Sequence, residues 1–485
     1  MHQTIEQEMV HTWSAGSKSI KDKSVTIRNL DQDRFVEILQ SKLSVRSPVK
    51  SIERLFGRDR ELELVEEALF DQGGHVFIYG DRGVGKSSLA ASVAAQYQSS
   101  DNEPIQIPCG KDTCFYKTIE EIAERILRRA GGRRDLEYTH TLNLKLYKLQ
   151  IKDKERSITI SPIDSMFSAV DVMEEMVGVH SERPVVVIDE FDQIESVSER
   201  AKFAHFLKDL GDRGVNVKFI FTGIASSLYQ LLGDHESSFR QLFTLKLERL
   251  YWSYREDIAY SAIKAFDLEV DEEIVHSIAR ISNGFPYFVH LLTQNLLWSV
   301  FKDEQEVSRI ERVHFDAAIA RSIIGISGRL QRPYDSAVLH KGHDYLLALW
   351  ATADSEDTVR YGDNIFKSYV RINQQLFGLD PVEADKKPLE PAQFRKILKK
   401  FLGKDCGEVL ELVEGREHMY SYRENLLRGF VALKAQEAGI ELQGDLPDEP
   451  RIPTAMARSR FSGGQGRLSA YAADPSKQVK FRSEH

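Results

Sequence analysis

The stretch GDRGVGKS, residues 80–87, places three glycines and a lysine directly after the apolar run HVFIY. Glycine permits left-handed backbone conformations, so several N–H groups of one loop can point at the same anion. The spacing G-x-x-x-x-G-K-S stands before KSSLAASVAAQY, which is rich in helix formers. The stretch therefore predicts a strand, a phosphate-binding loop and a helix, which is a unit of an α/β fold.

This loop predicts a site for ATP and Mg²⁺. We expect Lys86 to reach the β- and γ-phosphates and the Ser87 hydroxyl to ligate Mg²⁺. A glycine turn that binds nothing is the alternative. The predicted nucleotide-binding residues of the loop are Gly80, Asp81, Arg82, Gly83, Val84, Gly85, Lys86, Ser87 and Ser88.

Hydrolysis also needs carboxylates at the end of a neighbouring buried strand, one to hold the metal ion and one to activate water. The run VVVIDE supplies Asp189 for the metal ion and Glu190 for the water. Thr222, at the end of the run FIFTG, could also orient water, although a threonine at a strand end needs no such role. The predicted catalytic residues therefore include Lys86, Glu190 and Thr222.

Apolar runs alternate with helical patterns along the first half of the chain, and the runs are apolar on both faces. This pattern indicates a parallel sheet covered by helices. One predicted helix, TIEEIAERILRRA, has a capping-box pattern at Thr118 and Glu121. We expect an extension over 1–50, an α/β core over 51–250 with an insertion of unknown role at about 132–162, a helical lid over 251–335, a winged helix over 336–440 and a disordered tail over 441–485.

The winged-helix prediction rests on element order. Helical HDYLLALWAT, DNIFKSYVRINQQL and PAQFRKILKKFLG are followed by two strand-like runs joined at 414–417. Three helices and then a hairpin is the order of that domain. A winged helix lays one helix in the major groove of DNA while the hairpin contacts phosphates.

Composition excludes several classes of protein. The net charge of -9 argues against a uniformly basic nucleic-acid binder, although a local basic surface is compatible with it. Three cysteines without a CxxC pair suggest neither a disulfide framework nor a zinc site. The start has no apolar signal region and no window is apolar enough to span a bilayer, so we expect a cytoplasmic protein without membrane association.

The motifs together resemble those of AAA+ and STAND P-loop ATPases, in particular origin-recognition-like and related prokaryotic ATPases with a C-terminal winged helix. FGRDREL, residues 56–62, is similar to the box ahead of the first core strand, and NGFPYFVHLL, residues 283–292, to the G-x-P lid segment. The resemblance implies a P-loop NTPase fold of the AAA+ (ASCE) type with a parallel sheet and a helical lid. It also implies that Arg58 and Pro286 contact the adenine side, whereas a helix-start arginine and a helix N1 proline are their structural alternatives.

In such ATPases an arginine before the last core strand reaches a neighbouring subunit's γ-phosphate, and Arg240 stands at that position here. The alternative is a solvated arginine. Two departures from the family pattern are Thr222, where asparagine is frequent, and His290, where a sensor arginine is expected. Both favour a switch-like ATPase over a fast one.

The sequence PAQFRKILKKFLGK predicts a helix with a basic face over an apolar one. Its basic residues Arg395, Lys396, Lys399 and Lys400 are candidates for contact with duplex DNA, but the predicted hairpin after it is acidic on balance. DNA contact, a protein-binding surface and a solvated face all remain open. We therefore expect an ATP-hydrolysing oligomeric switch acting on DNA, as initiator, loader or transposition regulator, or alternatively a STAND-like signalling or anti-phage ATPase that assembles with a protein partner.

Overall fold

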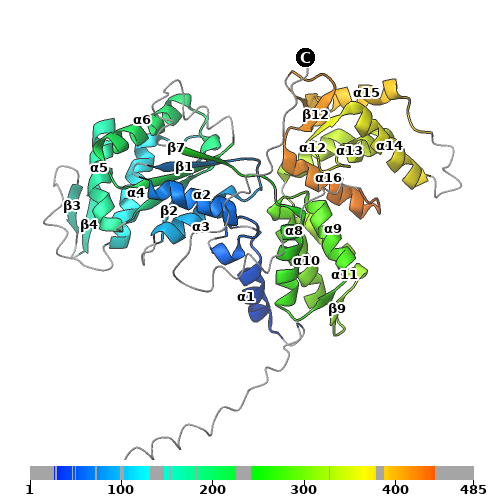
Figure 1. Cartoon of the computed structure of the whole chain (residues 1–485), viewed down its shortest axis with the longest axis horizontal. Helices are drawn as coiled ribbons and strands as arrows, with labels where there is room; N and C mark the ends of the chain where they lie inside the picture. The colour runs from blue at the N-terminus through cyan, green and yellow to red at the C-terminus, as the bar shows by residue number, and fades with distance from the viewer. Residues whose placement is uncertain are drawn as a thin grey trace, which may run out of the picture. The chain divides into compact units, whose positions relative to one another are not determined.

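The structure is a computed structural model, and its described residues run from 27 to 442 with several gaps (Figure 1). A compact unit covers Met1–Leu446 by its internal contacts, and the description below concerns that unit. The described residues are 27, 30–45, 47–49, 51–71, 74–98, 103–130, 147–152, 155–181, 183–224, 242–326, 328–377, 387–413 and 415–442.

A five-stranded sheet in the order β2-β5-β6-β1-β7 forms the core of the first part. Every neighbouring pair in it is parallel, as the apolar runs predict. Since parallel strands end at the same edge, the residues after β1, β5 and β6 are brought together there. The strands are β1 (His75–Tyr79), β2 (Ile105–Pro108), β5 (Val185–Asp189), β6 (Lys218–Gly223) and β7 (Leu242–Lys246).

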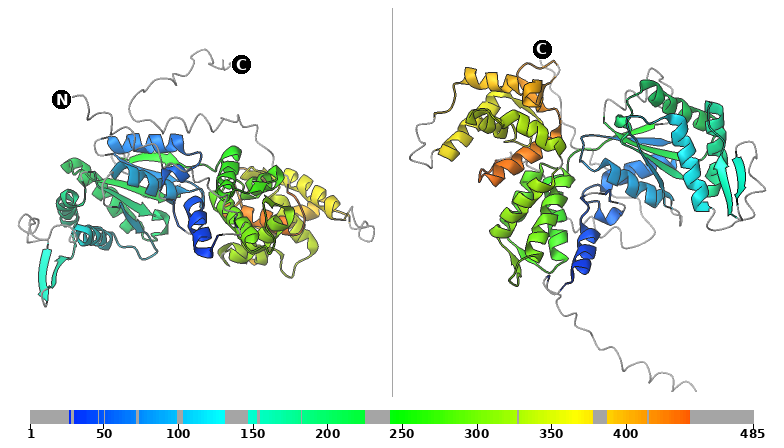
Figure 2. Two further views of the ribbon diagram at one scale, coloured as in Figure 1. Left: turned by 90° about the horizontal axis from the view of Figure 1, so that it is seen from below. Right: turned by 180° about the vertical axis from the view of Figure 1, so that it is seen from behind.

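Helices cover both faces of this sheet (Figures 1 and 2). On one face α2 (Asp59–Phe70) and α3 (Lys86–Gln98) pack in the same apolar cluster as Val76, Val187 and Ile220 of the strands. On the other face lie α4 (Phe115–Ala130), α5 (Met166–His180) and α6 (Val197–Arg213), whose apolar residues pack with Phe77 and Phe221. Burial on both faces explains why the strand sequences show no polar alternation.

The start of α4 corrects one prediction. The capping box expected at Thr118 and Glu121 is wrong, because α4 begins at Phe115 and the Thr118 hydroxyl donates to the carbonyl of Cys114 instead. The Phe115 N–H donates to a carboxylate oxygen of Glu199, on α6, over 2.7 Å. A partner distant in sequence thus satisfies an N-terminal N–H group and lets the helix start earlier.

The predicted insertion contains an antiparallel hairpin of β3 (Tyr147–Lys152) and β4 (Glu155–Ile160). Residues 131–146 and 153–154 of the insertion lie outside the described residues. The hairpin is paired along its whole length, from Tyr147 opposite Ile160 to Lys152 opposite Glu155. Its role stays open.

Four helices follow the sheet and form the expected lid: α8 (Trp252–Lys264), α9 (Glu272–Ser282), α10 (Pro286–Phe301) and α11 (Arg312–Gly325). A short parallel pair, β8 (Glu269–Val270) with β9 (Arg309–Ile310), ties its loops together. The N-terminal helix α1 (Gln32–Lys42) packs on this lid through Phe35, which stacks on Phe301 with ring centroids 4.2 Å apart. Part of the expected extension is therefore integrated into the lid.

The remaining elements are α12 (Gly328–Val338), α13 (His343–Thr352), β10 (Val359–Tyr361), α14 (Gly362–Phe377), α15 (Pro391–Lys400), β11 (Leu410–Leu412), β12 (Met419–Tyr422) and α16 (Asn425–Glu437). The three strands form an antiparallel sheet in the order β10-β12-β11. The helices and the hairpin occur where the sequence predicts them. The winged-helix assignment itself stays a prediction, as do the domain boundaries.

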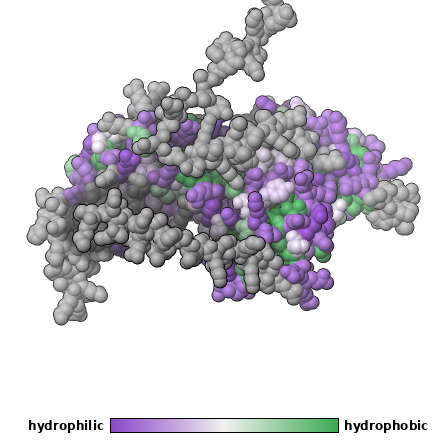
Figure 3. All heavy atoms as spheres, turned by 60° about the horizontal axis from the view of Figure 1, so that its bottom comes forward, coloured by the Kyte–Doolittle hydropathy of each residue, from purple (hydrophilic) through white to green (hydrophobic). Residues whose placement is uncertain are grey.

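The face drawn in Figure 3 is mostly hydrophilic over the described residues, with hydrophobic residues in small patches between them. Within the described part of the chain, no helix is long and apolar enough to cross a bilayer. The predicted tail after residue 441 lies almost wholly outside the described residues.

Candidate functional site

The glycine loop connects β1 directly to α3, which begins at Lys86. Gly80, Gly83 and Gly85 all have positive φ, at 153°, 82° and 100°. A Cβ on Gly80 would lie 2.4 Å from the carbonyl oxygen of Leu247, so the loop passes too close to β7's end for a side chain. The glycines therefore satisfy a backbone requirement, as the phosphate-loop reading expects.

Lys86 lies inside this loop, and its Nζ donates to the carbonyls of Gly80 and Asp81 over 2.9 and 2.8 Å. Burial lowers the pKa of Lys86, while the nearby carboxylates of Asp192 and Asp81 oppose that shift. The ammonium group lines the cavity described below, together with Ser87 and Ser88. An ammonium held between backbone carbonyls in this way can exchange them for phosphate oxygens.

The end of β5 brings a carboxylate to the first turn of α3. Asp189 is 8% exposed, and its Oδ1 accepts a hydrogen bond of 2.7 Å from the Ser87 hydroxyl. The buried Thr222 hydroxyl, from the end of β6, also donates to Oδ1. Gln106 of β2 donates to the other oxygen over 3.1 Å. The start of α3, the end of β5 and the end of β6 thus place oxygen atoms together, and β2 supports the carboxylate through the Gln106 amide nitrogen.

Ser87 and Asp189 have the donor chemistry that Mg²⁺ prefers, and they face one another at hydrogen-bond distance. These two residues fit a magnesium ion as predicted. Among the described residues no group of three or more His, Cys, Asp or Glu side chains forms a metal site by itself. A cation here would accordingly share its remaining ligands with phosphate oxygens and water, which is usual for Mg²⁺.

Glu190 follows Asp189 and differs from it in exposure. Its backbone adopts a left-handed conformation with φ 55°, and its N–H donates to Asp189 Oδ1 and to the Thr222 hydroxyl, over 3.1 and 3.0 Å. This conformation is uncommon for glutamate and is held by these two bonds. Glu190 is exposed and lines the cavity, so its carboxylate is free to contact water there.

Asp192, just after this pair, was not among the predicted site residues. Its carboxylate accepts a hydrogen bond of 2.9 Å from the guanidinium of Arg82 in the loop, and both residues line the cavity. Its position in the run DEFD, close to Asp189 and Glu190, was the sequence feature that could have identified it. Gln106 was missed as well, although it lies in the strand that pairs with β5.

These residues surround a cavity of about 430 Å³, a size typical of small-ligand sites. The loop, Glu190 and Thr222 form one wall. The opposite wall comes from distant parts of the chain: Ser44, Val45, Ser47, Pro48, Val49, Pro286, Tyr287, His290, Arg329, Leu330, Glu424 and Leu426. Nothing in the sequence singled out 44–49, Arg329 or Glu424.

The segment 44–49 is fixed to the helix after the loop. The Val49 N–H donates to the Ser88 hydroxyl over 3.0 Å, and Ser92 donates to the Val49 carbonyl over the same distance. Val49 is therefore held against α3, and the described residues of this segment line the cavity.

Arg58 and Pro286, both predicted on the adenine side, differ in position. Pro286 lines the cavity and is also the N1 residue of α10. Arg58 is 5% exposed, is not among the lining residues, and donates to the carbonyls of Val84 and Glu248 over 3.0 and 2.7 Å. It thus supports the loop from behind.

His290 lies in the cavity wall where a sensor arginine was expected. The ring is 6% exposed, and its Nδ1 has no hydrogen-bond partner among the described residues. Burial, with a smaller effect of Arg54, lowers the pKa of His290 to about 4. The ring is therefore neutral at physiological pH and supplies no positive charge to the site.

The C-terminal region reaches the loop through the start of α16. Asn425 donates to the carboxylate of Asp81 over 3.0 Å, and a Cβ on Gly83 would lie 2.9 Å from Leu426 Cδ1. Glu424, just before them, accepts from Arg329 over 3.0 Å at the rim of the cavity.

The other predicted residues are away from this cavity or undescribed. Arg240 lies outside the described residues. Arg395, Lys396, Lys399 and Lys400 are all on the exposed face of α15, and its apolar residues Phe394, Ile397 and Leu398 are buried. Arg395 pairs with Asp363 over 3.0 Å, and Lys400 lies over the Tyr345 ring.

Comparisons with known proteins give a family match over part of the chain and several similar solved structures. Residues 54–220 match the family described as AAA ATPase domain. Similar solved structures include a Walker-type ATPase of Pyrococcus abyssi, with 17% identity over 79% of this chain and 98% of that one and a TM-score of 0.47. The Aeropyrum pernix ORC1 protein in complex with DNA has 16% identity over 79% and 93%, with a TM-score of 0.39. The ORC2 protein of the same organism, in ADPNP–ADP complexes, has 12% identity over 83% and 98%, with a TM-score of 0.43.

No curated protein matches the chain significantly. The resemblance to AAA+ P-loop ATPases inferred from the motifs is confirmed by the family match, which covers the loop and the Asp189–Glu190 pair. Residues 54–220 of this chain are an AAA ATPase domain.

Proposed function

We propose that this protein binds and hydrolyses ATP with Mg²⁺ and uses the nucleotide to control the position of its C-terminal region. The observation that carries this proposal is the contact of α16 with the glycine loop. Asn425 hydrogen-bonds to Asp81, and Leu426 packs on Gly83, so a residue pair at the C-terminal region touches the loop that surrounds the phosphates. A change in the loop's conformation when the nucleotide binds would therefore alter the contacts of α16.

In the hydrolytic site each residue has a distinct task. Lys86 and the loop N–H groups would bind the phosphates, and Ser87 with Asp189 would hold Mg²⁺, which would neutralise charge at the phosphates. Glu190 accepts a proton from the attacking water, and Thr222 holds the Asp189–Glu190 turn through its hydroxyl. The neutral His290 supplies no positive charge at the position where a sensor arginine was expected, which favours a slow, switch-like ATPase.

The switch is tested by hydrogen exchange of α16. In complexes with ADP and with a non-hydrolysable ATP analogue, we expect different protection of the amides of residues 425–437, because the two ligands bring different charge into the cavity that Glu424 and Leu426 line. Asn425→Asp places a second carboxylate against Asp81 and should make the protection low and equal in both complexes. Equal protection in the wild-type complexes would contradict the switch while leaving ATP binding untouched.

For a DNA partner, support comes from α15. Lys396 and Lys399 are exposed and make no ion pair with another described residue, whereas Arg395 and Lys400 are engaged with Asp363 and Tyr345. The order α13, β10, α14, α15, β11, β12 is compatible with a winged helix that presents α15 to a groove. We propose duplex DNA as the partner of this helix.

The DNA proposal is tested by measuring ATP hydrolysis at about 0.1 M salt with and without duplex DNA. The affinity for the same DNA is measured separately. Lys396→Glu with Lys399→Glu should abolish stimulation and lower the salt slope of binding by about 2, since each lost phosphate contact lowers it by about 0.9. Lys117→Glu with Lys208→Glu, on exposed positions of α4 and α6, makes the same change in charge and should leave both unchanged. Hydrolysis that is indifferent to DNA would favour the alternative, a STAND-like ATPase with a protein partner.

We also propose that the protein forms an oligomer. The support is the position of Arg240 in the sequence, from which it would contact a nucleotide bound to a neighbouring subunit. Arg240→Ala and Lys86→Ala should each be inactive alone, the first with normal ATP affinity. If Arg240 acts between subunits, mixing them restores part of the activity, because some interfaces combine an intact loop with an intact arginine. No recovery at any ratio would remove the support for this role.

A further inference from the structure

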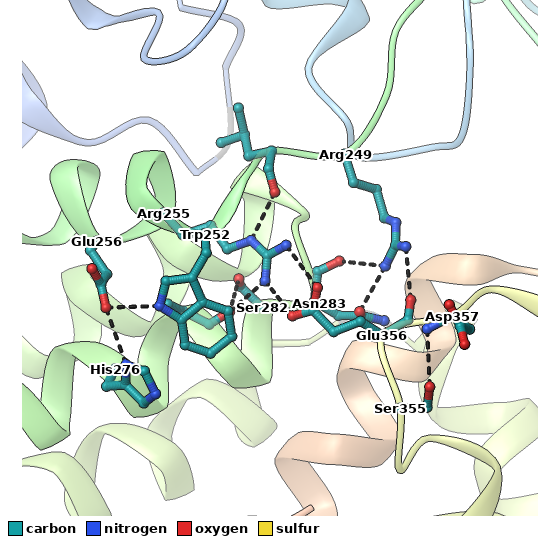
Figure 4. A network of polar contacts seen from close by, with 12 residues as sticks. Arg249, Trp252, Arg255, Glu256, His276, Ser282, Asn283, Ser355, Glu356 and Asp357 are labelled. Atoms are coloured by element: carbon teal, nitrogen blue, oxygen red, sulfur yellow. Dashed lines mark hydrogen bonds and ion pairs between the residues drawn. The ribbon is translucent and has the colours of Figure 1, made fainter. Parts of the chain in front are cut away.

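Three arginines from separate parts of the chain donate to Glu356. Figure 4 shows two of them, Arg249 and Arg255, beside this residue. Arg255 of α8 makes two bonds with the Glu356 carboxylate, over 2.6 and 3.2 Å. Arg249, between β7 and α8, donates to the Glu356 carbonyl over 2.8 Å. Arg428 of α16 donates to the same carbonyl over 3.1 Å and to that of Asp357 over 2.6 Å.

The charges in this cluster do not balance. Among the described residues, the one carboxylate hydrogen-bonded within the cluster is that of Glu356, and it pairs with Arg255 alone. Arg249 and Arg428 donate to neutral backbone carbonyls there. Arg255 and Arg428 are 3% and 2% exposed. Burial, and then the charge of Arg249, lowers the pKa of Arg428 to about 9, so the group remains protonated at neutral pH. A buried excess of positive charge is unfavourable unless an anion compensates it.

Hydrogen-bond donors are also in excess. Nε and Nη2 of Arg428 have no partner within the described part of the chain, and the same is true of Nδ2 of Asn283. Asn283 is 5% exposed, and its side-chain oxygen already accepts from Arg249 over 2.7 Å. Buried donors without an acceptor are rare and costly in native proteins.

These unpartnered donors border a small cavity. It has a volume of about 20 Å³, and Asn283, Ser355, Glu356 and Arg428 are among its lining residues. That volume holds one water-sized particle and excludes sulfate, phosphate and carboxylic acids. Arg280 and Gln436 also line it and add further donor groups.

We propose that this cavity is a binding site for a single small anion of the halide class, chloride in the cell, held by Arg428 and Asn283. The anion supplies the missing negative charge and accepts the unpartnered N–H groups. Because Asn283 belongs to the turn between α9 and α10, and Arg428 to α16, the anion joins the lid to the C-terminal region. The site is separate from the nucleotide cavity, and its existence does not depend on the proposed function.

The test measures the thermal unfolding midpoint of the full-length protein while chloride replaces gluconate at about 0.2 M total salt, where screening of surface charges is constant. We expect the midpoint to rise by about 2 °C or more with a saturating dependence on chloride, as for a ligand of the native state. Bromide should act in the same way, and chloride-35 NMR should show line broadening by the protein that bromide reverses.

Asn283→Asp tests the site specifically. Asparagine adopts φ 49° here, a conformation that aspartate also tolerates, and the new carboxylate would provide the negative charge itself. The variant should have a higher midpoint in gluconate and no saturating response to chloride. Asn364→Asp, at an exposed position of α14, makes the same change in charge and should keep the wild-type response.

Two results would overturn the proposal. A wild-type midpoint that is indifferent to chloride, or that changes linearly without saturation, would mean that water or another group satisfies these donors. A saturating response that Asn283→Asp retains in full would place the bound anion elsewhere. The wild-type titration and the NMR measurement decide the question even if Asn283→Asp does not fold.

Discussion

The two walls of the nucleotide cavity differ in how the chain builds them. The core wall comes from the ends of adjacent parallel strands, where Lys86, Glu190 and Thr222 follow directly from local motifs. The opposite wall collects 44–49, the start of α10, Arg329 and the start of α16, which share no local pattern. The first wall has the residue types that hydrolysis needs, and the second contains residues that no sequence motif marks.

The most severe way to break the core wall is Lys86→Ala. Removing one partner of a buried charge pair costs about 3–5 kcal/mol, so ATP affinity should fall by at least about 100-fold and hydrolysis should be undetectable. Calorimetric titration with ATP measures the affinity. Retained micromolar binding would disprove the phosphate-loop assignment, and Lys208→Ala, on the exposed surface of α6, serves as the control.

Glu190→Gln should separate binding from chemistry in the same wall. The amide cannot accept a proton, so kcat should fall by about 10²–10⁴-fold, whereas ATP affinity should change little because Lys86 and Asp189 are intact. Single-turnover hydrolysis and nucleotide titration measure the two effects. Normal turnover would exclude Glu190 as the general base.

Acid should destabilise the molecule through one buried histidine in each region, His75 at the start of β1 and His290 in the opposite wall. Burial lowers the pKa of His75 to about 3 and that of His290 to about 4. Since both lie below the unfolded value near 6.5, stability is fully present above that pH and is lost as the pH falls toward the folded values. His290 alone should account for about 2 kcal/mol between pH 7.5 and 5.

Denaturant unfolding of wild type and His290→Gln at these two pH values checks this prediction. The variant has no ring to protonate, so it should lose less stability than the wild type over the same interval. An identical loss in both proteins would show that the His290 ring is not kept neutral by its surroundings.

The smallest effects should come from the rim of the opposite wall. Arg329→Ala should weaken ATP binding and Glu424→Gln should strengthen it, each by about two- to fivefold, because an exposed pair contributes only about 0.4–1 kcal/mol. The effects should be smaller for ADP, which carries less charge. Changes of the same sign in the two variants would mean that the Arg329–Glu424 pair acts only by its structural contact.

Much of the core could be predicted, since its signals are local. The apolar runs gave the order of strands and helices, and the glycine spacing identified the loop because only glycine tolerates the backbone of residues 80, 83 and 85. The error at Thr118 and Glu121 arose from a contact that is not local, because Glu199 of α6 takes over the capping of α4. The N–H groups at a helix start can be capped by a local side chain or by a carboxylate distant in sequence. Which of the two caps them depends on the packing.

Arg58 and the arginines around Glu356 show more clearly which contacts could not be predicted from the sequence. A helix-start arginine in the motif FGRDREL predicts a ligand contact and a cap equally well, and the guanidinium instead holds the Val84 carbonyl from behind the loop. Nothing near Arg249, Arg255 or Arg428 in the sequence indicates that they meet, since they come from different elements.

The sequence by itself determined the α/β core, the phosphate loop and the Asp189–Glu190 pair, because each depends on backbone conformation and on burial along a few consecutive residues. The tertiary structure alone decided that 44–49, His290, Arg329 and Glu424 enclose the same cavity, and that α16 contacts the loop. It also brought Arg249, Arg255 and Arg428 together at Glu356. These arrangements depend on packing between segments far apart in the chain, for which spacing along the sequence carries no information.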